Sequence, residues 1–461
     1  MSTTPNDISP GTLPREQAAA QMGRLDSLDA FRGLTIAAMI TVNNPGTWSY
    51  VYEPLLHVNW NGLAPADLIF PSFVFMVGVS IAFSFCRHLA QGTPRGSLAS
   101  KVLTRAAKIY LVGMALCLVE PLLRIAVTQT WTTFNYWEFF TVELRYTGVL
   151  HRIALVFLAC GLLFLYTKTR TQVIVCTLFL VGYWLCMSYI PMPGMEPISE
   201  EVAVTSTEST ELPETVAADT TLWHRVDTLL RTPTVELRPG DNLATWVDSK
   251  LLPGRTWWGP WNPERNWEEW KESEPNMQPW DPEGFLSTVP SICSGLIGIF
   301  VGLLLLSPRT QERKAILLFF SGALLMAAGY AWGLIFPINK SLWTSSYVLF
   351  AAGFSSTVLA ACIYYMDILG RKRLLHFAVI FGGNAIAIYS LSWILALFLY
   401  GNPFGFWGDT AGPNHLVMDW LLANIPGYTE KCASLTYALL FVAVNFIPAY
   451  VLYKAKVYIR L

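Results

Sequence analysis

The stretch ADLIFPSFVFMVGVSIAFSFC, residues 66–86, decides the fold class of this chain. Its only charged side chain is that of Asp67, and apolar residues dominate the remaining positions. A helix of about 20 such residues crosses the hydrocarbon core of a bilayer. Because lipid offers the backbone no hydrogen-bond partners, a run of this kind must satisfy its own amides and carbonyls as a helix. We therefore predict a membrane-spanning helix over residues 66–86.

The same pattern recurs along the chain, which indicates a polytopic membrane protein. Hydrophobic residues make up 53% of the 461 residues and charged residues only 14%, whereas soluble proteins carry about 25% charged residues. The expected fold class is all-α, a membrane helix bundle of about ten transmembrane helices. The other predicted spans are 28–46, 103–126, 147–166, 171–190, 286–306, 314–336, 342–365, 375–400 and 434–453. A net charge of −1 creates no field that would attract nucleic acid.

The distribution of basic residues predicts how the bundle is oriented. Lys and Arg accumulate in cytoplasmic loops, and alternate loops of the ten-helix scheme are rich in them. The basic inner positions include Arg87, Arg95, Lys101, Lys168, Arg170, Arg309, Arg313, Arg371, Lys372, Arg373, Lys454 and Lys456. The expected outer segment 44–65 has no Lys or Arg. Both termini are therefore expected in the cytoplasm.

This topology divides the chain into four expected parts. Residues 1–24 form a cytoplasmic polar tail, and residues 25–190 hold transmembrane helices 1–5 together with the outer loop 44–65. Residues 191–285 form a long extracytoplasmic loop between helices 5 and 6, rich in acidic residues and tryptophan. Residues 286–461 hold helices 6–10. The tryptophans of the long loop suit either anchors at the membrane interface or flat surfaces for sugar rings, and the sequence leaves both readings open.

The densest group of polar residues lies at the outer ends of the first two spans. It comprises Asn43, Asn44, His57, Asn59, Asn61 and Asp67. A histidine can take a proton near neutral pH or attack an acyl group, and asparagine amides can donate to the oxyanion of acyl transfer. An interfacial histidine bonded to a carbonyl, and an Asp67 that only caps its helix, are the structural alternatives.

Three further polar sets accompany this group. ELRYTGVLHRIAL opens the fourth span with Arg145, His151 and Arg152, and FPINKSLWTSSY forms an outer turn with Asn339 and Lys340. Asn384 lies within the ninth span, where packing against other helices explains it as well as a ligand does. The eight cysteines include no C-x-x-C pair, and no Cys/His cluster has the spacing of a zinc site. No metal is expected.

Two long strings resemble a known family. RLDSLDAFRGLTIAAMITVNNPG, residues 24–46, and HVNWNGLAPADLIFPSFVFMVGVSIAFS, residues 57–84, are similar to the membrane domain of the heparan-α-glucosaminide N-acetyltransferase family, including its bacterial members. The similarity continues in the same order through RYTGVLHRIAL, DPEGFLSTVPSI and NKSLWTSSYVLF. It extends from about residue 24 towards the C-terminus.

The resemblance implies a transmembrane acetyltransferase that uses acetyl-CoA as co-substrate. Acetyl-CoA would be supplied from the cytosol, and the acetyl group would pass to an amino sugar or glycan on the far side. The catalytic histidine of the family falls on His57, and its catalytic asparagine falls on Asn43, with Asn44 directly adjacent. The segment between Asn43 and His57 is longer than in the lysosomal enzyme and lacks its glycine run. This difference leaves the acceptor open.

Roles follow for the candidate residues. His57 would act as general base or carry the acetyl group, Asn43 would hold the carbonyl oxygen, and Asp67 would orient His57 or the acceptor. Substrate binding is expected from Trp60, Asn61, Arg145, His151, Arg152, Asn339 and Lys340. The phosphates of acetyl-CoA are expected at the inner basic residues Arg105, Lys108 and Arg371.

Other functions stay open at this point. A sugar O-acyltransferase of the cell envelope differs only in its acceptor, whereas a secondary transporter or a non-catalytic envelope protein needs no acetyl-CoA. The expected location is the bacterial inner (cytoplasmic) membrane, with the lipid bilayer, acetyl-CoA and an amino sugar as partners and without nucleic acid. A homo-oligomer is neither indicated nor excluded.

Overall fold

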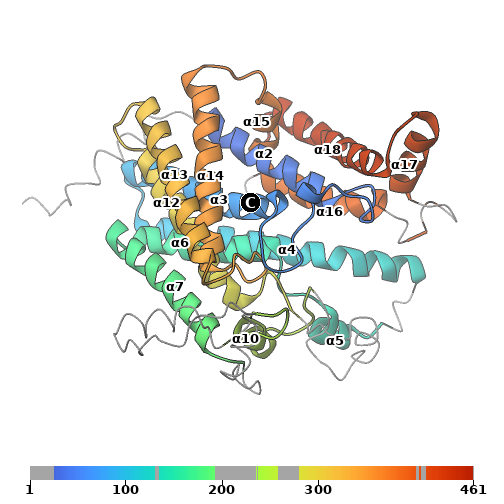
Figure 1. Ribbon diagram of the computed structural model, residues 1–461, viewed down its shortest axis with the longest axis horizontal. Helices are drawn as coiled ribbons and strands as arrows, with labels where there is room; N and C mark the ends of the chain where they lie inside the picture. Colours follow the sequence, from blue (N-terminus) through green and yellow to red (C-terminus); the bar gives the residue numbers. More distant parts are fainter. Residues whose placement is uncertain are drawn as a thin grey trace, which may run out of the picture.

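The computed structural model of the chain describes residues 25–129, 134–192, 235, 237–257, 280–400, 404–405, 407 and 412–459. The expected polar tail 1–24 and most of the expected outer loop 191–285 lie outside these residues. The described residues form helices and no strand, and Figure 1 shows their arrangement.

The long helices correspond closely to the predicted spans. They are α2 (Asp26–Asn43), α3 (Ile69–Ala90), α4 (Arg95–Thr128), α6 (Val149–Tyr166), α7 (Thr169–Tyr189), α12 (Phe285–Leu305), α13 (Gln311–Gly333), α14 (Ser345–Ile363), α15 (His376–Gly383), α16 (Ala385–Leu399) and α18 (Glu430–Lys454). The shorter elements are η1 (Glu53–Leu55), η2 (Pro65–Leu68), α5 (Tyr136–Glu138), η3 (Phe139–Glu143), α10 (Leu243–Leu251), η4 (Tyr364–Ile368) and α17 (Pro413–Asn424).

Eight helices of the described residues are long and apolar enough to cross a membrane, and nine if α15 and α16 form one bent span. The helix over the first predicted span, α2, is 18 residues long but carries the charged residues Asp26, Asp29 and Arg32. It is not among the eight. The predicted all-α polytopic bundle is confirmed, while the count of ten stays a prediction.

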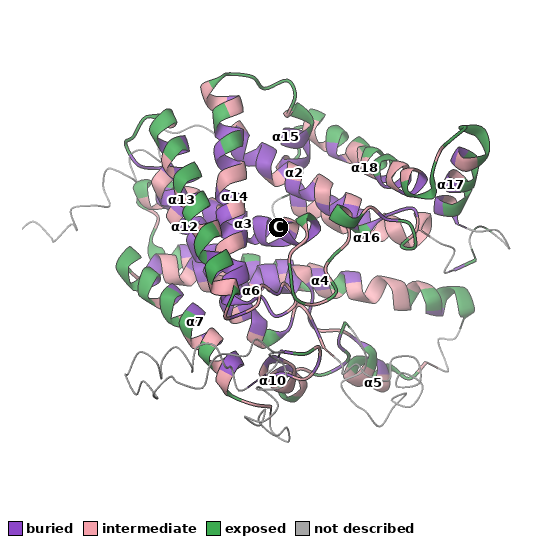
Figure 2. Cartoon of the chain, viewed as in Figure 1, coloured by how far each residue is buried: buried purple, intermediate pink, exposed green. Residues whose placement is uncertain are grey.

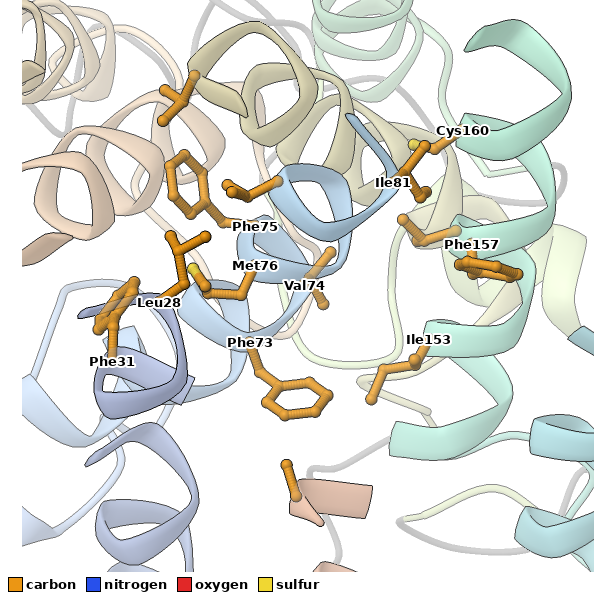
Figure 3. Close-up of a cluster of buried hydrophobic side chains, with 14 of the residues drawn as sticks. Leu28, Phe31, Phe73, Val74, Phe75, Met76, Ile81, Ile153, Phe157 and Cys160 are labelled. Atoms are coloured by element: carbon orange, nitrogen blue, oxygen red, sulfur yellow. The ribbon is translucent and has the colours of Figure 1, made fainter. Parts of the chain in front are cut away.

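Helix α3 runs through the centre of the bundle, and its side chains are buried along most of its length (Figure 2). Figure 3 shows α3 side chains such as Phe73 and Met76 between those of α2 and α6. Small residues allow the backbones to approach closely. A Cβ on Gly78 of α3 would lie 1.9 Å from the carbonyl oxygen of Gly295 in α12, so only glycine fits there.

The ninth predicted span is broken rather than continuous. Helices α15 and α16 meet at Asn384 with a bend of 86°. The Asn384 amide donates to the carbonyl of Val457 over 3.0 Å, and its Oδ1 accepts from the Ile459 amide over 2.8 Å. A non-helical backbone is tolerated at membrane depth where protein groups satisfy it. The side chain of Asn384 therefore joins the helix break to the chain beyond α18.

Three segments meet at the end of the bundle where α3 begins. The Trp60 indole donates to the carbonyl of Leu237 over 2.6 Å, and the amide of Gly62 donates to the carbonyl of Ile338 over 2.8 Å. Loop 44–65, the 237–257 segment and the turn between α13 and α14 thus lie together. All three belong to expected outer segments, as alternation of the loops requires. Which face meets the cytoplasm stays a prediction.

Candidate active site

The candidate site is built around a buried carboxylate at the start of α3. Asp67 lies in η2, where Pro65 begins the turn, and its side chain is 0% exposed. Its Oδ2 accepts from the amides of Ala64 over 3.0 Å and Val58 over 3.3 Å. Its Oδ1 lies 2.8 Å from Nδ1 of His57. Capping and orientation of the histidine, which the sequence offers as alternatives for Asp67, therefore coexist.

His57 reaches Asp67 from loop 44–65, and about a third of its side chain (36%) stays exposed. Because Nδ1 faces the carboxylate, Nε2 is the ring nitrogen left to meet a substrate. This arrangement resembles the acid–histidine half of a catalytic triad, in which a buried carboxylate fixes the ring and stabilises its protonated form. The pair is chemically suited to general-base or nucleophilic work.

Lys340 approaches the same atoms from the turn between α13 and α14. Its Nζ lies 2.9 Å from Nδ1 of His57 and 3.3 Å from Oδ1 of Asp67. Burial lowers the pKa of Lys340, and the carboxylates of Asp67 and Glu283 oppose this shift. Lys340 is predicted above as a substrate-binding residue. The structure places it instead against the candidate catalytic pair, and a substrate contact stays a prediction.

Asn61 and Asn339 tie the loops around this group. The Asn339 amide donates to Oδ1 of Asn61 over 3.1 Å, and its own Oδ1 accepts from the Leu342 amide over 2.8 Å. Trp60 packs edge to face on Trp280, with ring centroids 5.2 Å apart. Asn61 and Trp60 follow His57 on the same loop, and Asn339 precedes Lys340, which contacts His57. Their predicted role in binding substrate stays a prediction.

The expected catalytic asparagine does not contact the histidine directly through a hydrogen bond in the described part of the chain. Asn43 is the last residue of α2 and is exposed, whereas Asn44 is buried and its amide donates to the Ile40 carbonyl over 2.9 Å. Among the described residues no hydrogen bond joins either asparagine to His57. Since Asn44 is engaged by its own helix, Asn43 is the residue of the two whose amide faces solvent.

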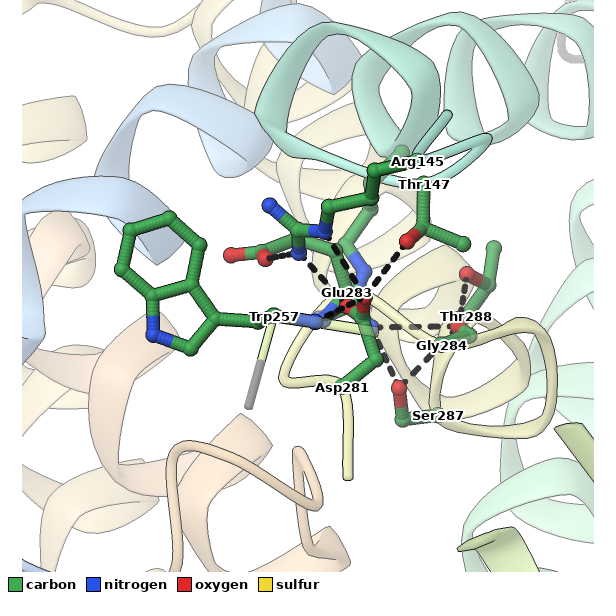
Figure 4. Close-up of polar contacts among 9 residues, drawn as sticks. Arg145, Thr147, Trp257, Asp281, Glu283, Gly284, Ser287 and Thr288 are labelled. Carbon is green, nitrogen blue, oxygen red and sulfur yellow. Dashed lines mark hydrogen bonds and ion pairs between the residues drawn. The ribbon is translucent and has the colours of Figure 1, made fainter. Parts of the chain in front are cut away.

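Figure 4 shows a second polar cluster, which is built around Arg145. Arg145 binds both oxygens of Asp281, over 2.7 and 2.6 Å, and contacts Glu283 over 2.6 Å. Asp281 also accepts from the Thr147 hydroxyl over 2.6 Å and from the Trp257 amide over 3.0 Å. Burial opposes the charge on Arg145, but the two carboxylates outweigh it and raise the pKa of the guanidinium.

The partners of Arg145 are functional residues that the sequence reasoning missed. The string DPEGF supplies Asp281 and Glu283, but nothing local shows that both face an arginine 136 and 138 residues earlier. The guanidinium holds the segment before α12 against the segment before α6. Its predicted contact with substrate stays a prediction, and two of its three side-chain nitrogens, Nε and Nη2, already donate to protein carboxylates.

His151 and Arg152 do reach into the bundle, as expected for the opening of the fourth span. Arg152 is 1% exposed, donates to the hydroxyl of Ser287, and lies 4.8 Å above the Trp343 ring. Its Nε and one terminal nitrogen have no hydrogen-bond partner in the described part of the chain, and neither have the ring nitrogens of His151. The His151 ring packs on that of Tyr110, with centroids 4.5 Å apart. Substrate binding by either residue stays a prediction.

A cavity of about 280 Å³ lies alongside the other half of α3. It is lined by Arg32, Phe73, Met76, Val77, Ser80, Ile81, Ser84, Phe85, Arg105, Ile109, Ile153, Phe157, Gly382, Gly383, Asn384, Ala385, Ile386 and Ile459. From Phe73 to Phe85 the helix rises about 18 Å. Two arginines border this cavity, and its lining combines polar and apolar groups, so it suits a molecule with an apolar part and an anionic end.

Of the three residues expected to bind the phosphates of acetyl-CoA, the cavity includes one. Arg105 lines it, with its guanidinium 5.0 Å above the Phe157 ring. Lys108 and Arg371 are exposed and do not line it. Arg32 of α2 also borders the cavity, pairs with Asp29 over 3.1 Å and donates to Ser80 over 2.9 Å. Among the described residues no three His, Cys, Asp or Glu side chains are placed to hold a metal ion.

Comparison with known proteins gives this geometry a family context. The family model "Heparan-alpha-glucosaminide N-acetyltransferase, catalytic" matches residues 24–201, which include His57 and Asp67. The human heparan-alpha-glucosaminide N-acetyltransferase is 24% identical over 488 aligned positions, covering 98% of this chain and 62% of the human protein. The mouse protein is 24% identical, covering 96% of this chain and 61% of its own length. The chain thus spans about 62% of the length of the human relative. Its predicted resemblance to the heparan-α-glucosaminide N-acetyltransferase family is confirmed by both comparisons.

Proposed function

We propose that this protein is a transmembrane acetyltransferase. It moves an acetyl group from cytosolic acetyl-CoA to the amino group of a glucosamine-type sugar on the opposite side of the membrane. The observation that best supports this proposal is the arrangement along α3. The His57–Asp67 pair lies at one end of this helix, and the arginine-bordered cavity lies along its other half. The names of the related proteins, and the share of this chain that aligns with them, support the same assignment.

The donor is proposed to occupy the cavity. Arg105 and Arg32 would face the phosphates, and the apolar side chains of Phe73 and Phe157 would line the pantetheine arm. Asp67 precedes Phe73 by six residues, which corresponds to about 9 Å along a helix. An arm that follows α3 from the cavity would therefore bring its thioester towards His57. We also propose that the exposed side chains of Lys108 and Arg371 attract the phosphates of acetyl-CoA electrostatically.

The chemistry is proposed to centre on Nε2 of His57. As the acceptor amine attacks the thioester carbonyl, a C–N bond forms, the C–S bond breaks, and Nε2 takes the amine proton. Asp67 stabilises the resulting imidazolium, and the proton then passes to the departing thiolate of coenzyme A. Asn43 is proposed to hold the carbonyl oxygen. An acetyl-histidine intermediate, in which Nε2 itself attacks first, is the alternative order of the same steps.

The acceptor is proposed to bind among the loops at this end of the bundle. Trp60 supplies an aromatic surface beside His57, and Asn61 with Asn339 supplies polar groups at its edge. Arg145, His151 and Arg152 would also contribute to binding the acceptor. We propose a bacterial inner membrane as the location, with both termini in the cytoplasm, and the orientation is supported by the distribution of Lys and Arg among the loops.

The test uses purified full-length protein in detergent with radiolabelled acetyl-CoA and a panel of amino and hydroxyl sugars. Transfer to glucosamine, identified by the mass of the product, is the expected result. His57→Ala should lower kcat/KM by about 10²- to 10⁴-fold. Full activity in this variant would reject the assigned role, and products acetylated only on oxygen would identify a sugar O-acyltransferase instead.

One observation favours a second candidate function. Secondary transporters place broken helices around their substrate sites, and the 86° break between α15 and α16 borders the cavity at Asn384. Such folds pair broken helices in two repeated halves, whereas the described residues contain a single bent pair. Sugar uptake into proteoliposomes without acetyl-CoA would support transport, and its absence beside active acetyl transfer would exclude it.

A further inference from the structure

Nδ1 of His57 lies within hydrogen-bond distance of an acidic side chain, Asp67, and of a basic side chain, Lys340. Nδ1 lies 2.8 Å from Oδ1 of Asp67 and 2.9 Å from Nζ of Lys340, and the latter two atoms are 3.3 Å apart. A neutral imidazole carries at Nδ1 either one hydrogen or one lone pair. It can therefore donate to Asp67 or accept from Lys340, but it cannot do both at once.

The position of Lys340 is fixed by the turn that carries it. Asn339 is 0% exposed, and its Oδ1 accepts from the Leu342 amide over 2.8 Å. Trp343 takes a left-handed backbone conformation with φ of 53° and is buried. Strain of this kind persists only where the surroundings hold it. The backbone on either side of Lys340 is thus anchored, and from this turn the ammonium group reaches His57 and Asp67.

We propose that the charge of Lys340 opposes protonation of His57 and so keeps its ring neutral until it takes a proton from the acceptor. Asp67 alone would stabilise the imidazolium, and a ring that is already protonated cannot act as a base. A second positive charge about 3 Å away disfavours that form. Lys340 is then a positioning and tuning residue of the reaction, in addition to any contact with substrate. This role rests on the proposed acetyl transfer, but its physical basis can be measured without it.

The other charged groups near Asp67 and Lys340 do not change the balance of charge at His57. Glu283 acts on Lys340 from the segment before α12, but it is itself bound to Arg145 over 2.6 Å. Glu53, on the same loop as His57, is exposed, and no ion pair joins it to the histidine among the described residues. Asp67 and Lys340 are therefore the charges that decide the protonation of the ring.

The test measures the pH dependence of His57 modification by diethylpyrocarbonate, which attacks only unprotonated imidazole. Purified full-length protein is treated over a pH series, and the modified peptide is quantified by mass spectrometry. The exposed His415 of α17 is the reference in the same digest. In Lys340→Met the midpoint should move to higher pH by about one unit. Lys340→Arg keeps the charge and should keep the midpoint, while Asp67→Asn should move it to lower pH.

An unchanged midpoint in Lys340→Met would overturn the proposal. If that variant also raised KM for the acceptor, Lys340 would be a substrate-binding residue only. Lys340→Gln carries the same test if the methionine variant does not fold. Modification by diethylpyrocarbonate needs neither acetyl-CoA nor acceptor. The charge effect of Lys340 and the proposed acetyl transfer can therefore be rejected separately. A shifted midpoint in a protein without acetyl transfer would reject the proposed function and leave the charge effect standing.

Discussion

The two polar clusters, around His57 and around Arg145, use similar residues in opposite ways. In the His57 cluster, Asp67 is fully buried while the histidine is 36% exposed, and one ring nitrogen faces both an acid and a base. In the Arg145 cluster, the arginine is 14% and Asp281 1% exposed, and each oxygen of Asp281 has a protein partner.

We propose that this difference separates a site for chemistry from a structural clamp. Both oxygens of Asp281 are held by protein donors, and removing Arg145 would leave a buried charge without its partner. A cluster with an exposed ring and competing partners can change its protonation at little structural cost. Sequence reasoning placed Arg145 with the substrate-binding residues, because charge alone does not distinguish the two cases.

The largest expected effect is the loss of stability when Arg145 is replaced. Arg145→Met leaves Asp281 and Glu283 buried without their cation, which should lower the free energy of unfolding by about 3–5 kcal/mol. The measurement is the thermal midpoint followed by tryptophan fluorescence in detergent. Arg95→Met, at an exposed arginine, is the matched control and should change stability by no more than about 0.5 kcal/mol. A stable Arg145→Met variant with weakened acceptor binding would contradict the clamp and support the predicted role of Arg145 in binding substrate.

Asp67→Asn should separate activity from stability. The amide oxygen can still accept from the backbone that Asp67 caps, but the carboxylate that orients and stabilises the histidine is lost. We expect kcat to fall by about 10²-fold with the fold retained. Asp281→Asn is the counterpart in the clamp, and it should weaken folding more than turnover. Equal effects of the two variants on both quantities would remove the distinction between the clusters.

The smallest effect is expected beside the clamp, at Asp248 of α10. This carboxyl is buried and accepts from the Leu286 amide over 3.0 Å, and burial raises its pKa from 3.8 to about 7. A raised pKa means that the folded state prefers the protonated acid. The stability it contributes is therefore full below pH 3.8 and is lost as the pH rises through 7.

Asp248→Asn should consequently stabilise the protein, by about 2 kcal/mol more at pH 8 than at pH 5. Thermal midpoints of the variant and the natural chain at the two pH values give the difference directly. Glu53→Gln, an exposed site remote from α10, corrects for general charge effects. A constant difference between the two proteins at both pH values would contradict the assigned protonation.

Much of the fold follows from local composition. Spans such as 66–86 are recognisable because the alternation of lipid and water along the chain dictates which residues each segment can carry. The break at Asn384 was missed, since FGGNA reads as a continuous apolar run. It depends on hydrogen bonds to Val457 and Ile459, more than 70 residues away.

The residues of the candidate site also fall into two groups, those that the sequence associates and those that only the fold brings together. His57 and Asp67 are ten residues apart in one motif, so the sequence could associate them. Lys340 lies 283 residues from His57, and Asp281 lies 136 residues from Arg145. No periodicity or spacing encodes such pairs, because they depend on how separate helices pack and on which loops then meet. The sequence by itself was enough to predict the membrane helix bundle, the resemblance to the family and the candidate catalytic histidine. Only the tertiary structure decided which charges surround that histidine, because side-chain contacts across helices are set by three-dimensional packing.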